Sequence, residues 1–203
     1  SCCIMSAGVT QDDETASMTA KRLIKICRKK GLYETPEYND SLFLNYEGFN
    51  AIKNLEPYIN MKSLFLEGNV IAKIENISHL KHLRGLYLQK NIITAIGKEL
   101  NNLTELTSLD LGNNEISSIK EGELNNLTNL ETLNLENNRL SAIEDIEEII
   151  HNKSLITLNL NGNKFDTKGE GMKLLALLSK LPNLKTLYLK GNKFLNNMDF
   201  YRK

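Results

Sequence analysis

The 203-residue sequence predicts an α/β solenoid, a right-handed coil of stacked repeats whose short parallel strands form a sheet on the concave side. The first observation is a pattern, L-x-x-L-x-L-x-x-N, that recurs six times at intervals of 22 to 29 residues. The second is that leucines alternate with polar residues inside each copy. The third is a hydrophobic content of 41%, with which stacked units can bury a continuous core. The six copies begin at Met61, Leu83, Leu106, Leu130, Leu155 and Leu184.

The fourth copy shows why the pattern predicts one strand in each repeat. Leu133 and Leu135 flank Asn134, so the leucines point into the core while the polar side chain points out of the concave face. This is the arrangement of a leucine-rich repeat, and residues 61–203 are predicted to hold six of them.

The asparagine that closes each pattern is predicted to be structural. After the strand the chain turns, and the backbone N–H and C=O groups inside the turn have no partner in the sheet. An asparagine amide both donates and accepts, so stacked copies can form a column that hydrogen-bonds the neighbouring turns. The predicted column contains Asn69, Asn91, Asn114, Asn138, Asn163 and Asn192.

A degenerate first repeat is predicted at residues 39–60. Glu47 stands where the asparagine would be, and a first coil has no earlier turn to bond. The expected apolar positions are Leu42, Leu44, Phe49 and Ile52.

Residues 18–38 are predicted to cap the N-terminal end of the solenoid. A helix there would cover the open edge of the first strand, which otherwise invites pairing with other chains. Residues 1–17 show no periodicity and are expected to form a flexible tail, which makes 18–203 a single domain. The helix is expected at residues 19–30, with Leu23, Ile24 and Cys27 on its inward face and Gly31 as its stop.

The cap helix carries six basic residues, which allow two interpretations. They can form a solvated outer face of the cap, or a patch that binds nucleic acid or membrane. The first is favoured because the net charge of the whole chain is zero. The residues are Lys21, Arg22, Lys25, Arg28, Lys29 and Lys30.

The convex side is predicted to change along the chain. Early returns such as residues 73–77 are too short for more than a 3₁₀ turn or an extended segment. The 29-residue fifth repeat leaves room for a true helix at residues 171–178, which ends before Pro182. Residues 191–203 resemble the start of a C-terminal cap that remains incomplete.

The concave face is where binding is expected, because its outward positions are not needed for the core. Three aromatic residues follow one another at its N-terminal end, and exposed apolar stripes of this kind usually mark interaction sites. The alternative is that these rings only pack against each other or against the cap segment near Tyr46. A protein partner with an apolar anchor and a basic flank would fit the face. The candidate binding residues are Phe43, Phe65, Glu67, Tyr87, Gln89, Lys90, Asp110, Asn134, Glu136, Asn159 and Tyr188.

Catalytic and cofactor signals are absent from the sequence. It has no glycine-rich phosphate loop, G-x-S-x-G, paired-cysteine motif or H-E-x-x-H, so no enzyme activity, cofactor or metal is predicted. His79 and His82 are three residues apart but lack a third ligand, and both are expected to face water. Nucleic acid is not expected as a partner, because Lys90 and Lys190 are the only cations predicted on the concave face.

Compartment is inferred from cysteines and signals. Secreted leucine-rich-repeat proteins usually close their ends with disulfide-bonded caps, whereas Cys27 stands alone on the predicted cap helix. The sequence contains neither a signal peptide nor a stretch long and apolar enough to cross a membrane. We therefore expect an intracellular, cytoplasmic protein without membrane contact, and a monomer.

The N-terminal third resembles a particular family. The stretches KRLIKICRKKGLY at 21–33, TP at 35–36, ND at 39–40, LFLNYEGF at 42–49 and LFLEGN at 64–69 resemble the opening of the leucine-rich-repeat dynein axonemal assembly factors. The resemblance covers residues 18–203, strongly in the first hundred. The repeats in general resemble the intracellular class typified by the regulatory subunit of protein phosphatase 1.

This resemblance implies a function. Dynein axonemal assembly factors are cytoplasmic scaffolds that preassemble dynein arms before the arms enter cilia or flagella. The implied partners are dynein chains, assembly chaperones or co-factors, bound on the concave face. Two alternatives remain open at this point: a regulatory subunit of a protein phosphatase, and, with less support, a spliceosomal-type protein adaptor.

Overall fold

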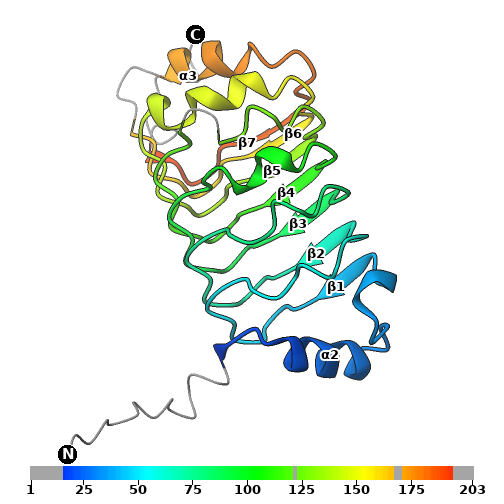
Figure 1. Cartoon of the computed structure of the whole chain (residues 1–203). Coiled ribbons are helices and arrows are strands. Elements are labelled where there is room, and N and C mark those ends of the chain that lie inside the picture. The colour runs from blue at the N-terminus through cyan, green and yellow to red at the C-terminus, as the bar shows by residue number, and fades with distance from the viewer. Residues whose placement is uncertain (1–15, 121–122, 167–170, 194–203) are drawn as a thin grey trace, which may run out of the picture.

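Seven short strands form one parallel sheet, which runs through the molecule as a ladder (Figure 1). The computed structural model describes residues 16–120, 123–166 and 171–193. The strand order follows the chain from first to last, as expected when each repeat adds one strand. The solenoid predicted from the sequence is therefore confirmed. The strands are β1 (Ser41–Phe43), β2 (Ser63–Phe65), β3 (Gly85–Tyr87), β4 (Ser108–Asp110), β5 (Thr132–Asn134), β6 (Thr157–Asn159) and β7 (Thr186–Tyr188).

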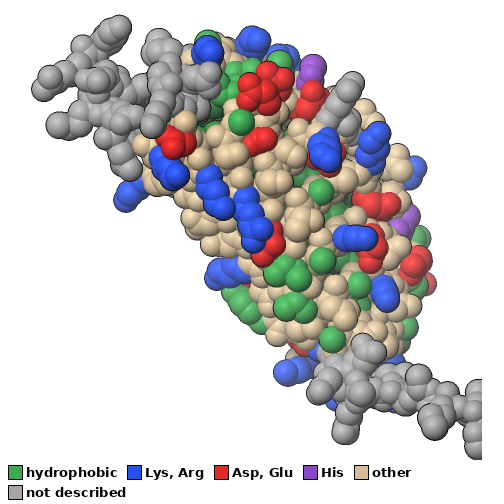
Figure 2. Space-filling view, turned by 90° about the vertical axis from the view of Figure 1, so that its left-hand side faces the viewer, with side chains coloured by type: hydrophobic (Ala, Val, Ile, Leu, Met, Phe, Trp, Pro, Cys, Tyr) green, Lys and Arg blue, Asp and Glu red, His purple; other side chains and the backbone are tan. Residues whose placement is uncertain are grey.

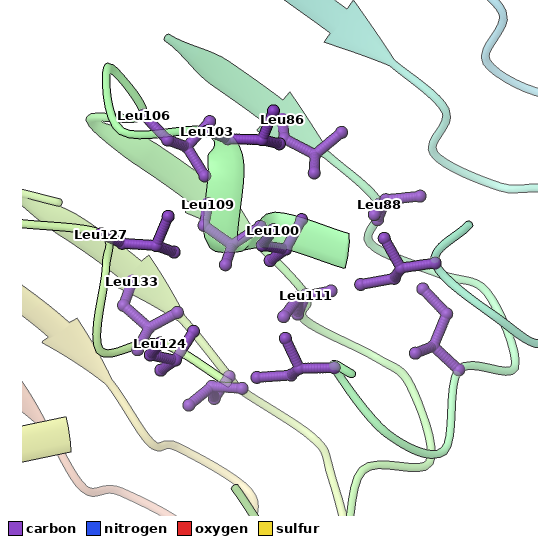
Figure 3. Close-up of a cluster of buried hydrophobic side chains, with 14 of the residues drawn as sticks. Leu86, Leu88, Leu100, Leu103, Leu106, Leu109, Leu111, Leu124, Leu127 and Leu133 are labelled. Atoms are coloured by element: carbon purple, nitrogen blue, oxygen red, sulfur yellow. The ribbon is translucent and has the colours of Figure 1, made fainter. Parts of the chain in front are cut away.

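The core is a stack of leucine layers between the sheet and the convex returns. Leu86, Leu109 and Leu133, from the centres of three neighbouring strands, are fully buried. Figure 3 shows leucines from the returns, among them Leu103 and Leu127, pointing toward them. Each repeat therefore buries its apolar side only against its neighbours, and the core extends along the solenoid axis.

Helix α2 (Ala20–Lys29) caps the N-terminal end, as predicted (Figure 1). The Thr19 hydroxyl accepts a hydrogen bond from the Arg22 backbone N–H at 3.2 Å, and the left-handed φ of Gly31, +69°, follows the helix end. The predicted inward face was partly wrong. Leu23, Ile26 and Cys27 are buried, whereas Ile24 is half-buried, because the i, i+3, i+4 spacing from Leu23 selects residues 26 and 27.

Three of the six basic residues of α2 and its C-cap make contacts within the cap. The Nζ atom of Lys30 donates to the carbonyl oxygen of Phe43 at 2.7 Å, on the edge strand β1. Arg22 and Lys30 lie 3.7 and 3.6 Å from the carboxylate of Glu47, and Arg28 pairs with Glu34 at 2.8 Å. Glu47, which replaces the first asparagine of the column, thus ties the first coil to the cap helix instead of to an earlier turn.

The convex returns become more helical along the chain. Residues 71–80 contain no helix, whereas α3 spans Gly171–Leu178, as the sequence predicts for both. The 3₁₀ helices η1 (Pro36–Tyr38), η2 (Glu99–Asn102) and η3 (Ile143–His151) were not predicted. Helix η3 buries three isoleucines spaced three residues apart, which is the period of a 3₁₀ helix. These are Ile143, Ile146 and Ile149.

Two sequence predictions concern residues that lie mostly outside the described ranges. The predicted tail at 1–17 lies outside the described residues except for its last two positions. The predicted C-terminal cap is described only from 191 to 193. Within the described residues, no helix is long and apolar enough to cross a membrane.

Candidate protein-binding surface

One residue from each strand lines the concave face in a continuous row. The strands pair in register, so the last residue of each strand lies beside the last residue of the next. Because side chains alternate between the two faces of a strand, these residues point away from the leucine core. The row is Phe43, Phe65, Tyr87, Asp110, Asn134, Asn159 and Tyr188, the order derived from the sequence.

The three aromatic residues at the N-terminal end stack on one another, and we call them the aromatic stack. The ring centroids of Phe43 and Phe65 are 4.8 Å apart, and those of Phe65 and Tyr87 are 4.6 Å apart with an interplanar angle of 5°. Gly85 is buried under the last ring, where an added Cβ would lie 3.0 Å from a ring carbon of Tyr87. Phe43 remains 38% exposed, and the other two rings are half-buried. The rings therefore pack against each other, as the alternative interpretation held, and still present an apolar surface.

Exposed hydrophobic side chains concentrate at the same end of the molecule. Figure 2 shows hydrophobic side chains grouped on one face toward the N-terminal end, below a line of Lys and Arg side chains. Among the described residues, eight large hydrophobic side chains are exposed, and seven of them precede residue 93. The aromatic stack is thus part of a more apolar half of the solenoid, which is where an interaction surface is expected. The eight are Tyr33, Tyr38, Phe43, Tyr46, Ile59, Val70, Ile92 and Tyr188.

Two unusual backbone positions border the aromatic stack. The residue before each asparagine of the column has a positive φ, and so does Tyr46 (φ 59°), which precedes Glu47 in the first coil. These residues are glycine or asparagine at every position except Tyr46 and Lys90 (φ 58°). The Tyr46 ring lies over Gly68, leaving no room there for a Cβ, and Lys90 Nζ donates to the Tyr46 hydroxyl at 3.3 Å. Strained positions of this kind cluster at functional sites. This contact was not predicted from the sequence, although a tyrosine at a position otherwise held by glycine or asparagine was its signal.

The middle of the concave row is polar and acidic. Asn134 Nδ2 donates to Asp110 Oδ1 at 2.9 Å, and Asn159 Nδ2 donates to Glu136 Oε2 at 2.9 Å. Burial raises the pKa of the Asp110 carboxyl, and the negative charges of Glu136 and Glu67 raise it further. Three of the predicted binding residues therefore form a linked group of carboxylates.

The remaining candidate residues lie at the borders of this row. Gln89 donates to the carboxylate of Glu67, so these two predicted residues contact each other beside the aromatic stack. Tyr188, 48% exposed, stands on β7 at the opposite end of the sheet, separated from Tyr87 by β4, β5 and β6. The predicted residues thus form one face with rings at both ends.

The asparagine column makes the hydrogen bonds expected of it between neighbouring repeats. Asn114 is buried, and its Nδ2 donates to the carbonyl oxygens of Leu88 and Leu111, both at 3.0 Å. Its Oδ1 accepts from the backbone N–H of Ile93 at 3.0 Å. The other five members are buried as well, and their Nδ2 atoms donate in the same way to one carbonyl of the preceding repeat and one of their own. They are Asn69, Asn91, Asn138, Asn163 and Asn192.

The histidines do not come together as a metal site. His79 is half-buried and lies 3.0 Å from the Leu55 carbonyl oxygen, which corrects the prediction that it faces water, while exposed His82 contacts Glu105 at 3.1 Å. Across the described ranges, no group of three His, Cys, Asp or Glu side chains could hold a metal ion.

Comparisons with known proteins agree with the repeat architecture. Models described as "Leucine rich repeat" match residues 81–140, 104–165 and 183–202. Among solved structures, an internalin (inlF) from Listeria monocytogenes superimposes with a TM-score of 0.59 and 28% identity, covering 84% of this chain and 45% of its own. Internalin C2 (inlC2) of the same species gives a TM-score of 0.59 at 22% identity, with 87% and 88% coverage, which supports the fold alone.

Curated relatives indicate a narrower group. The leucine-rich repeat-containing protein ODA7 of Chlamydomonas reinhardtii is 41% identical over 188 residues, 93% of this chain and 42% of that protein. Dynein axonemal assembly factor 1 of Rattus norvegicus is 43% identical over 56 residues, 28% of this chain and 9% of its own. Its homologue in Aedes aegypti is 52% identical over 54 residues, 27% of this chain and 5% of its own. The chain spans less than half the length of these relatives. The chain belongs to the leucine-rich-repeat proteins, and among them it is similar to the dynein axonemal assembly factors.

Proposed function

We propose that this chain is a non-enzymatic scaffold for the preassembly of axonemal dynein arms, acting in the cytoplasm of cells that build cilia or flagella. The observation that carries the proposal is the 41% identity with the ODA7 protein over 93% of the chain, together with relatives named dynein axonemal assembly factors. Site chemistry is consistent with it, since the concave face offers an exposed aromatic surface and no catalytic constellation that we recognise among the described residues.

The scaffold would bind its partner through the concave face. The aromatic stack supplies apolar area and the carboxylates beside it supply polarity, the combination that protein interfaces use. We propose dynein chains, assembly chaperones or co-factors as partners, with the chain itself a monomer and without nucleic acid or membrane contact. Neither the phosphatase subunit nor the spliceosomal adaptor is favoured by the relatives described above.

Disruption of the gene in its source organism tests the role in dynein assembly. Axonemes isolated from the disrupted cells should contain strongly reduced amounts of dynein heavy chains by quantitative mass spectrometry, while their tubulin content is unchanged. Unaltered axonemal dynein would reject the proposal, and so would a source organism that builds no axonemes.

Complementation with variants tests the concave face. Phe65→Ala/Tyr87→Ala removes two rings of the aromatic stack and is expected to fail in restoring dynein to the axoneme. Tyr33→Ala/Tyr38→Ala is the matched control, because these exposed rings, with centroids 5.9 Å apart, lie outside the concave row. Full restoration by the Phe65/Tyr87 variant at wild-type protein level would exclude the aromatic stack as the binding surface.

A further inference from the structure

The aromatic stack ends abruptly at an acidic residue. Tyr87 is its last ring: one face stacks on Phe65, and no other aromatic ring of the described residues contacts it. In register beside it on β4 stands Asp110, followed by the short side chains of Asn134 and Asn159. Because neighbouring strands lie about 4.8 Å apart, the row from Tyr87 to Tyr188 spans roughly 19 Å and carries short polar side chains between two rings.

The carboxylates in this stretch lack cations within the described ranges. Asp110 Oδ1 accepts from Gly112 N at 3.0 Å and from Asn134 Nδ2, whereas Oδ2 has no hydrogen-bond partner among those residues. Among the described residues, the Glu136 carboxylate accepts only from Asn159, and neither carboxylate forms an ion pair with a Lys, Arg or His of that part of the chain.

Some other carboxylates on the solenoid do have cation partners. Glu115 lies 3.0 Å from an Arg139 nitrogen, and Glu105 contacts both Arg84 and His82. Asp110 and Glu136 are both half-buried, and burial together with the nearby charge of Glu136 raises the pKa of the Asp110 carboxyl. Two adjacent negative charges without a cation thus lie beside an aromatic ring, which is complementary to a cation supplied from outside.

We infer that the concave face binds an arginine side chain of the protein partner, with the guanidinium on the face of the Tyr87 ring opposite Phe65 and hydrogen-bonded to Asp110. A guanidinium is planar and delocalised, so it can stack on an aromatic ring and at the same time donate to a carboxylate in its own plane. A lysine ammonium is a point charge that would pair with Asp110 but would not stack. An apolar residue adjacent to that arginine would cover the aromatic stack. This inference rests on the proposed function only in that the concave face binds a protein.

A random 12-residue peptide library displayed on phage tests the inference, because it offers arginine to the concave face in many sequence contexts. The full chain serves as the target, and the Asp110→Asn/Glu136→Gln variant serves as the counter-target. Both substitutions keep an oxygen that can accept the existing hydrogen bonds from Asn134 and Asn159, so the fold should be retained. Clones that bind the wild type and not the variant are expected to contain an arginine next to an aromatic or large aliphatic residue.

The strongest clone is then made as a synthetic peptide in two forms, with arginine and with uncharged citrulline. By isothermal titration calorimetry, the citrulline form should bind the wild-type chain roughly tenfold or more weakly, as expected for the loss of a charge-assisted, stacked contact. The difference between the two forms should shrink to about twofold or less on the Asp110→Asn/Glu136→Gln variant. Glu144→Gln/Glu147→Gln removes the same charge from the exposed side of η3 and should preserve the full difference.

Three outcomes would overturn the inference. They are a library without clones that depend on Asp110 and Glu136, equal binding of the two peptide forms, or a difference that persists on the counter-target. Purely apolar selected peptides would count as the first of these outcomes, because they would show that the stack binds without a cation. None of these results affects the gene-disruption experiment. If axonemal dynein is lost in the disrupted cells but the peptide experiments are negative, the proposed function is retained and only the proposed arginine site is rejected.

Discussion

Replacement of Asn114 by leucine tests how strongly the asparagine column stabilises the solenoid. Leucine has a similar volume but cannot hydrogen-bond, so it keeps the interior filled and leaves the neighbouring backbone groups without the amide. The groups most affected are the N–H of Ile93, which donates to Asn114 Oδ1, and the carbonyls of Leu88 and Leu111. The carbonyl of Gly112 loses only a long contact of 3.4 Å and keeps its bond from the Lys90 N–H.

The size of the effect depends on which hydrogen-bond partners each backbone group keeps in the variant. The two carbonyls keep a second partner, since Asn91 and Asn138 also donate to them, so each loses about 0.5–1 kcal/mol. The N–H of Ile93 becomes a buried donor without an acceptor, which costs about 1–3 kcal/mol. The sum is about 3 kcal/mol, a large fraction of the stability of a typical domain.

Urea denaturation followed by far-ultraviolet circular dichroism measures the effect. For a chain of this size with a slope of about 3 kcal/mol per molar urea, the midpoint should fall by about 1 M. Asn60→Leu is the control, because exposed Asn60 makes a single hydrogen bond, to the Glu37 carbonyl, and should change stability by less than about 0.5 kcal/mol. Equal midpoints for the Asn114 and Asn60 variants would refute the reasoning that the column satisfies buried backbone groups.

Three further substitutions have defined outcomes. Glu123→Gln should lower the free energy of unfolding by about 1.5–3 kcal/mol in urea denaturation. The buried carboxylate accepts two backbone hydrogen bonds, one on each oxygen, whereas the amide has a single oxygen and can accept only one of them. An unchanged urea midpoint would contradict this prediction. Because the folded-state pKa of Asp110 is raised, its ionisation opposes folding above that pKa and has no effect below the ordinary carboxyl range. Asp110→Asn should therefore raise the urea midpoint at pH 7 and lose this advantage near pH 3, whereas a destabilised variant at pH 7 would disprove the sign. Gly68→Ala should cost more than Gly48→Ala in the same assay: both have a positive φ, worth about 1 kcal/mol, but only at Gly68 would the new Cβ displace the Tyr46 ring. Equal losses would show that the ring does not depend on that glycine.

Some features of the structure could not be predicted from sequence patterns. Glu123 is buried and accepts from the backbone N–H groups of Gly97 and Lys120 at 3.0 and 2.8 Å, yet a glutamate in a return resembles any solvated residue. Helix η3 was missed because apolar residues at a spacing of three fit several kinds of return. In both cases a contact with the neighbouring repeat contributes. Gly97 of the preceding repeat donates to Glu123, and the backbone N–H of Ile119 donates to the Asp145 carbonyl of η3.

The sequence by itself determined the repeat, the strand in each repeat and the order of residues on the concave face. These follow from local rules, because alternation within a strand fixes which side chains face the core, and a constant offset between copies fixes the register. The tertiary structure alone decided how those outward residues interact. That Phe65 stacks on Tyr87, that Tyr46 covers Gly68 and that Asp110 remains without a cation among the described residues all depend on side-chain directions in adjacent repeats. Such contacts form only once separate turns of the chain lie side by side, so patterns along the sequence can indicate where they occur but do not fix their geometry.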